Sequence, residues 1–142
     1  MNVLSDKDIY EILDFHKIKI NGIFQKDCIH ELKPGFYVIN LQSSSHGNGT
    51  HWCGLYFDKN KSLWYDSYGF NCPVEIQNLL SKYEYNAFHI QNIDSSSCGY
   101  YVIAFIKFLY HKKDKEKAFE TFINLFKPNT CQNEIILKQL LE

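Results

Sequence analysis

The sequence predicts the α+β class, with a small mixed or antiparallel β-sheet flanked by helices. The order of elements supports this prediction: three strand-like segments follow one another in the first half of the chain, and three helical segments follow one another in the second half. With 142 residues, 45% of them hydrophobic and 16% aromatic, the chain is expected to form one domain over residues 1–142.

Helical spacing of apolar residues, together with start signals, predicts five helices. Ser5 and Asp8 resemble a capping box and open the first helix. Pro73 suits the first turn of the second helix. The charged run 111–117 is expected to be a solvated turn. The expected helices cover residues 5–15, 73–80, 98–111, 118–126 and 130–141.

Short apolar runs bounded by turn residues predict the strands. Residues 16–34 show no clear period and are expected to be irregular, with one short strand or turn. A two-residue turn at Lys59-Asn60 joins the second and third strands into a hairpin, and this register places Cys53 opposite Asp66. The expected strands cover residues 35–42, 50–57, 62–66 and 86–91.

The composition limits the classes of partner. The net charge is −1 and all 15 basic residues are lysines, so we expect no strong binding of nucleic acid. No apolar stretch reaches membrane-spanning length, and the first residues do not resemble a signal peptide. We therefore expect an intracellular protein, or one packaged in a particle made inside the cell, without a membrane partner.

The cysteines are expected to be reduced thiols. They are odd in number and widely spread, without a CxxC pair, which indicates neither a disulfide framework nor a zinc site. We expect no metal and no cofactor. The cysteines are Cys28, Cys53, Cys72, Cys98 and Cys131.

Cys98 is the expected nucleophile because it stands where a polar, serine-rich loop changes into a buried helix. Unpaired amides and the positive end of the helix dipole meet at such a position and favour the thiolate, the reactive form of a cysteine. Gly99 leaves room beside it for a substrate backbone. The alternative is a small buried cysteine at the start of a core helix.

His51 is the expected base, and Asp66 is expected to orient it. The hairpin register puts Asp66 on the same face as His51 and one diagonal step away, at about 7–8 Å between backbone positions. An imidazole and a carboxylate can meet over this distance, so Asp66 would hold the ring while His51 takes the thiol proton. A change of one residue in the turn would put the two on opposite faces.

Other residues compete for these roles. His46, in a glycine-flanked loop, is the rival base. Cys53 lies within a strand and is the weaker nucleophile, and Cys131 lies near a helix start but without a loop of donors beside it. Gln91, seven residues before Cys98, is a neutral side chain that can donate to an oxyanion together with the Cys98 amide.

These residues together resemble the adenovirus-type (adenain-like) cysteine endopeptidases. That family is related to the ubiquitin-like-protein proteases and is encoded by adenoviruses, virophages and Maverick/Polinton-type elements. The resemblance covers about residues 1–112 and rests on the order His, acid, Gln, Cys. The matching segments are Thr50-His51-Trp52, Trp64-Tyr65-Asp66-Ser67-Tyr68-Gly69, Gln91 and Cys98-Gly99-Tyr100.

The resemblance implies a papain-like cysteine-protease core with the nucleophile at the N-terminus of a central helix. It implies Cys98 as nucleophile, His51 as general base and acid, Asp66 as orienting acid and Gln91 as oxyanion donor. It also implies cleavage of capsid or core precursor proteins during virion maturation, in the virion and the host-cell cytoplasm, often next to glycines.

Glycine-specific members of this family have narrow substrate slots, which Trp52, Gly54 and Gly99 would form here. In the family that this chain resembles, the adenovirus enzyme is a basic protein that DNA and a peptide activate. This chain is nearly neutral, so we expect no activation by DNA. A peptide activator is left open. The alternatives are a deubiquitinase or ubiquitin-like-protein isopeptidase, and a non-catalytic interaction domain.

Overall fold

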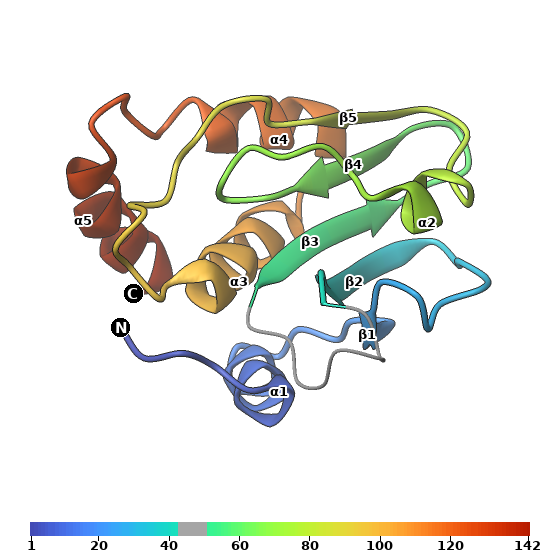
Figure 1. The fold of residues 1–142 in the computed structure, drawn as a ribbon, viewed down its shortest axis with the longest axis horizontal. Helices are drawn as coiled ribbons and strands as arrows, with labels where there is room; N and C mark the ends of the chain where they lie inside the picture. The colour runs from blue at the N-terminus through green and yellow to red at the C-terminus, as the bar shows by residue number, and fades with distance from the viewer. Residues whose placement is uncertain (43–50) are drawn as a thin grey trace.

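The computed structural model describes residues 1–42 and 51–142 and has a mixed α+β architecture, as the sequence predicts. A five-stranded sheet lies among the helices (Figure 1). The elements follow the order α1 (Asp6–Phe15), β1 (Gly22–Gln25), β2 (Gly35–Asn40), β3 (Trp52–Phe57), β4 (Ser62–Tyr65), α2 (Val74–Gln77), β5 (Tyr83–Tyr85), α3 (Cys98–Leu109), α4 (Lys115–Ile123) and α5 (Thr130–Leu141).

The strands lie in the order in which they occur along the chain, β1 to β5. β2, β3 and β4 pair antiparallel, whereas β1 and β5 run parallel to their neighbours at the two edges. Tyr56 pairs with Leu63 and Gly54 with Tyr65, which is the register expected from the Lys59-Asn60 turn. The predicted hairpin is confirmed. The predicted start of its first strand, Thr50, lies outside the described residues.

The prediction of a strand over residues 86–91 is wrong, because the fifth strand lies three residues earlier. Beyond β5 a side chain replaces the backbone pairing: the Asn86 amide accepts from the Asp66 N–H at 3.0 Å and donates to the Asp66 carbonyl at 2.6 Å. The following residues turn away, and Ile90 and Gln91 both donate their N–H groups to the Ser67 carbonyl.

Several other boundaries differ from the predicted ones. β1 agrees with the prediction for residues 16–34, which included one short strand or turn, and β2 gives it a parallel partner. α2 ends at Gln77, so residues 78–80 are not helical. α4 begins at Lys115, within the expected charged turn, because Asp114 caps it by accepting from the Lys117 N–H at 3.0 Å.

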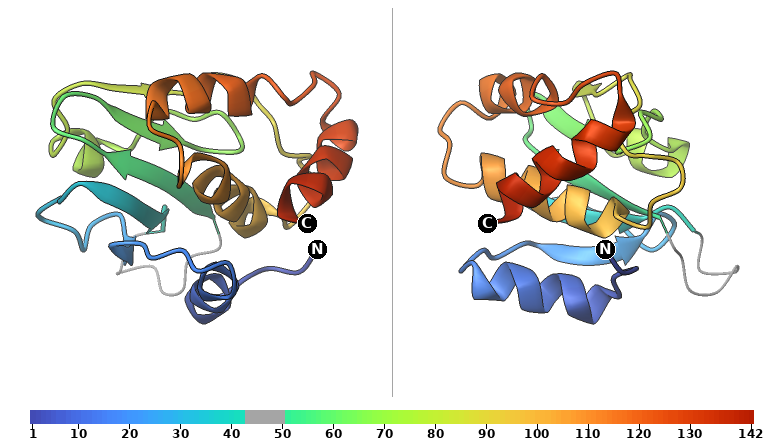
Figure 2. Two further views of the ribbon diagram at one scale, coloured as in Figure 1. Left: turned by 180° about the vertical axis from the view of Figure 1, so that it is seen from behind. Right: turned by 90° about the vertical axis from the view of Figure 1, so that its left-hand side faces the viewer.

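The two faces of the sheet carry separate apolar clusters. On one face, α3 packs against the sheet around Val38, Leu63 and Tyr65, and α1, α4 and α5 surround α3 in the same apolar cluster. On the other face, α2 packs its Ile76 near Trp64. Figure 2 shows α3 and α4 on the same side of the strands, with α2 on the far side. Within residues 1–42 and 51–142, no helix is long and apolar enough to cross a membrane.

Candidate active site

His51 and Asp66 meet at the end of the central hairpin, where one residue precedes β3 and the other follows β4. The imidazole Nε2 lies 2.9 Å from Asp66 Oδ1. The Asp66 side chain is fully buried, and that of His51 is 19% exposed. The contact expected from the register is therefore present.

The pKa of His51 is raised from 6.5 to about 9. Burial, the largest single influence, lowers this pKa, but hydrogen bonding to Asp66 and then to Cys98, together with the charges of both residues, outweighs burial. These influences favour the imidazolium form of the ring, which lies between Asp66 and Cys98.

Cys98 is the first residue of α3 and is 6% exposed. This helix contacts β3, α1, α4 and α5, so it is the central helix of the fold. Its first turn lies beside the start of β3, where His51 enters the sheet (Figure 1). Nε2 of His51 is bound to Asp66, which leaves Nδ1 for the hydrogen bond with Cys98. The expected nucleophile, base and acid thus lie together.

Tyr68 supports this group in two ways that the sequence did not reveal. Its N–H donates to Asp66 Oδ1 at 2.8 Å. Its ring stacks on the imidazole of His51, with centroids 4.8 Å apart and planes inclined by 24°. The turn-like sequence around Asp66 gave no sign that the next tyrosine would fold back over the histidine.

Gln91 is fully buried and its side chain is held by two serines. Oε1 accepts from Ser67 Oγ at 2.5 Å, and Nε2 donates to the Ser95 carbonyl at 3.1 Å and to Ser95 Oγ at 3.0 Å. Nε2 is the group that would donate to an oxyanion, and in this structure it is bound to Ser95. The role of Gln91 as an oxyanion donor stays a prediction.

The first turn of α5 lies beyond the segment of the family resemblance. It is nevertheless hydrogen-bonded to the loop that leads to Cys98. Asn133 is fully buried and donates to the carbonyls of Ile90 at 2.9 Å and Lys127 at 2.8 Å. Glu134 accepts from Ser97 Oγ at 2.8 Å and from the Tyr101 hydroxyl. Sequence reasoning missed both residues, because only the tertiary fold brings them to Ile90 and Ser97.

The expected substrate-binding residues have packing roles. A Cβ at Gly54 would lie 2.7 Å from Phe105 Cδ2, so this glycine allows α3 to approach β3, and a substrate slot there is not supported. A Cβ at Gly99 would lie 3.1 Å from Leu4 Cβ and 3.3 Å from Trp52 Cδ1. Trp52 is 5% exposed and donates its indole N–H to the Leu4 carbonyl at 2.9 Å.

The other candidates for base and nucleophile do not join this group in the same way. The loop with His46 lies outside the described residues. Cys53 is fully buried, and burial followed by the charge of Asp66 raises the pKa of its thiol well above the usual 9.0, so it stays protonated. Cys131 is exposed on α5. Nitrogen, sulfur and oxygen atoms of His51, Cys53 and Asp66 lie within 4.8 Å of one another, but a protonated Cys53 thiol does not fit a metal ion, because metals bind the thiolate.

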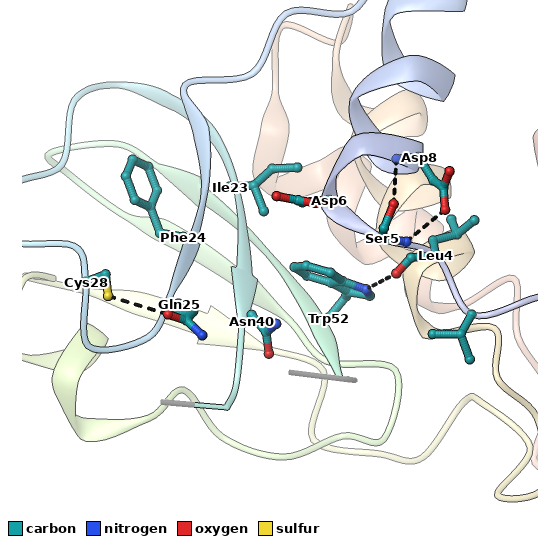
Figure 3. A pocket seen from close by; sticks show the side chains of 11 residues that line it. Leu4, Ser5, Asp6, Asp8, Ile23, Phe24, Gln25, Cys28, Asn40 and Trp52 are labelled. Carbon is teal, nitrogen blue, oxygen red and sulfur yellow. Dashed lines mark hydrogen bonds between the residues drawn. The ribbon is translucent and has the colours of Figure 1, made fainter. Parts of the chain in front are cut away.

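A groove of ≈ 740 Å³ lies beside the candidate site (Figure 3). It is formed by the residues that lead into α1, by β1, and by Asn40 and Trp52. Figure 3 shows the Trp52 indole at its wall, next to Leu4 and Ser5. Its link to the candidate site is Trp52, which directly follows His51 and whose Cδ1 would lie 3.3 Å from a Cβ at Gly99, the neighbour of Cys98.

Comparison with known proteins gives no further identification. No family model matches the chain, and no curated protein matches its sequence.

Proposed function

We propose that this chain is a cysteine endopeptidase with a papain-like core. The main support is the order of three groups in space: buried Asp66 lies 2.9 Å from His51, and His51 in turn faces Cys98 at the start of α3. An acid that orients an imidazole beside a thiol is the arrangement that nucleophilic catalysis by cysteine requires.

In the proposed reaction Cys98 acts as a thiolate paired with the imidazolium of His51. It attacks the scissile carbonyl carbon, and the carbonyl electron pair moves to the oxygen. The imidazolium of His51 then gives its proton to the leaving amine as the C–N bond breaks. Neutral His51 takes a proton from water, whose oxygen attacks the thioester and releases the acid and Cys98. Asp66 keeps the ring in place and balances its charge throughout.

The oxyanion needs donors that are already in position. We assign the Cys98 N–H at the first turn of α3 to this role, together with Gln91 Nε2. The latter has to exchange its bonds with Ser95 for the oxyanion. This exchange is a local rotation of a side chain that Ser67 still holds through Oε1.

The groove beside Trp52 is our candidate for the site that holds the substrate chain on one side of the cleaved bond. Following the family resemblance, we propose that the substrates are capsid or core precursor proteins cleaved at glycine-containing sites during virion maturation. The place of action would then be the virion and the host-cell cytoplasm.

Incubation with a peptide library of diverse sequence, followed by mass spectrometry, tests the proposal. We expect internal cleavages, enriched next to glycine, with the wild-type chain and with the control Cys131→Ser. We expect none with Cys98→Ala or His51→Ala. Cleavage by either of these two variants would contradict the mechanism. Covalent labelling of Cys98 by a ubiquitin-type electrophilic probe, without cleavage of the library, would assign a ubiquitin-like-protein isopeptidase instead.

A further inference from the structure

The two oxygens of the buried Asp66 carboxylate have different surroundings. Oδ1 accepts from His51 Nε2 at 2.9 Å and from the Tyr68 N–H at 2.8 Å. Oδ2 is buried, and no residue of the described chain is placed to form a normal hydrogen bond with it. A buried polar atom without such a partner is uncommon in folded proteins and calls for an explanation.

A thiol lies beside this carboxylate. Cys53 is fully buried in β3 and, two residues after His51, lies on the same face of the strand. Its Sγ, a ring nitrogen of His51 and a carboxylate oxygen of Asp66 lie within 4.8 Å of one another. Burial, followed by the charge of Asp66 and the contact with its carboxylate, raises the pKa of Cys53 well above 9.0. Cys53 is therefore a neutral S–H group, which is a weak donor.

A weak donor at this place has a consequence for His51. A hydrogen bond to an ionised carboxylate stabilises its charge and so weakens its attraction for a nearby proton. Because Oδ2 receives no strong donor, the negative charge of Asp66 acts mainly on His51, which is bound to Oδ1. A hydroxyl in place of the thiol would compete with the imidazolium for this charge.

We propose that Cys53 is a positioning residue whose weakly polar side chain fills the space beside Asp66, keeps stronger donors away from the carboxylate and thereby leaves its charge to His51. This inference rests on the proposed function, in which the imidazolium of His51 supports the Cys98 thiolate. The alternative is that Cys53 only fills space in the apolar cluster that it shares with Leu55 and Ile76.

Few other ionisable groups of the described chain lie close enough to disturb a test of this role. Those next to Asp66 and Cys53 are Tyr65, Tyr68 and Cys72. Burial is the largest cause that raises the pKa of each of these three side chains, so they stay neutral from about pH 6 to pH 9. Cys98 on α3 is hydrogen-bonded to His51, and Cys98→Ala removes its influence.

Titration of His51 by nuclear magnetic resonance tests the inference. The ring nitrogens report the charge of each histidine, and His51 is assigned by comparison with His51→Ala. In the Cys98→Ala chain, we expect Cys53→Ser to lower the midpoint of His51 by about one pH unit, because the hydroxyl donates to Asp66. Cys53→Ala has no donor and should not lower it. Cys72→Ser places a hydroxyl in the same apolar cluster, near Glu75, and should match the parent chain.

An unchanged midpoint in Cys53→Ser, or an equal fall in Cys53→Ala, would overturn the inference. If thermal melting shows that Cys53→Ser does not fold, Cys53→Thr carries the same hydroxyl and suits a strand, and Cys53→Val is its counterpart without the hydroxyl. Failure of the proposed function has a separate sign. A wild-type chain that cleaves no peptide of the library would overturn that function, whereas the shift in Cys53→Ser is measured without any cleavage.

Discussion

His51 is the residue whose charge depends most directly on the fold. Its ring is enclosed by the stacked Tyr68 and bound to a buried carboxylate, and Cys98 faces it from the first turn of α3. An imidazole in water would be mostly neutral at pH 7, since its pKa is about 6.5. Here the surrounding groups hold it as a cation, which is the form that favours a neighbouring thiolate.

The raised pKa of His51 predicts a pH-dependent stability. Because the folded-state pKa of about 9 exceeds the ordinary 6.5, the contribution of His51 is fully present below pH 6.5 and is lost as the pH rises through about 9. We expect the wild-type chain to lose at most about 3 kcal/mol relative to His51→Ala between pH 6 and pH 10. Urea unfolding of both proteins at the two pH values measures this difference. A constant difference would contradict the assigned pKa.

The stacked ring of Tyr68 gives a second prediction. Tyr68→Leu removes the aromatic contact with His51 but keeps the backbone N–H that binds Asp66. An aromatic pair contributes about 0.5–1.5 kcal/mol, so Cys98-dependent hydrolysis of p-nitrophenyl acetate should slow by about two- to tenfold. The matched control is Tyr68→Phe, which keeps the ring and should stay within about twofold of the wild type. An equal loss in both variants would assign the effect to the hydroxyl.

Among the elements, the β3–β4 hairpin positions the candidate site and α3 supplies the proposed nucleophile. The hairpin could be predicted because its register depends on a local turn at Lys59-Asn60 and on alternation along two neighbouring strands. The start of α3 could be predicted from the change from serines to apolar residues at Cys98. Both signals lie within a few residues of the feature that they specify.

The edge strands and the supporting contacts had no such local signal. β1 has four residues and β5 has three, and both are defined by parallel pairing with strands distant along the chain. Asn86 ends the pairing beyond β5 with its side chain, which no periodicity can show. For the same reason, Tyr68 and Glu134 became visible only when the fold placed them against His51 and Ser97.

The contact between β3 and α3 leads to a prediction about packing. In Gly54→Ala the new methyl group would lie 2.7–2.8 Å from the Phe105 ring, so the sheet and the helix would have to separate. Such overpacking costs about 1–3 kcal/mol in the free energy of unfolding. In a double-mutant cycle measured by urea unfolding, Phe105→Leu should reduce the added cost of Gly54→Ala. Strictly additive costs would show that the ring is not the obstacle.

In the molecule as a whole, the candidate site lies at one end of the sheet. His51 and Asp66 come from the hairpin, Cys98 from the central helix, and the loop between them is attached to α5. The family resemblance extends to about residue 112. The structure shows that residues beyond it hold the site together.

Asn133 therefore has a predicted effect on the stability of the whole chain. Asn133→Ala removes bonds to the Ile90 carbonyl and to both backbone groups of Lys127, and it leaves a buried carbonyl without its partner. We expect a loss of about 2–4 kcal/mol in urea unfolding. Gln132→Ala, its exposed neighbour, should change the stability by less than about 0.5 kcal/mol. Similar values for the two variants would show that this attachment is not important.

The attachment of α5 also has a consequence for the newly made chain. Ribosomes add about 5–20 residues per second, and a domain generally folds as a unit. Cys98 is thus made about 2–7 s before Glu134, the residue that holds Ser97 beside it. During that interval the loop before Cys98 lacks its contact with α5. Under the proposed function, the nucleophile would be held in place only after α5 has been made, and the unfinished chain would not yet cleave.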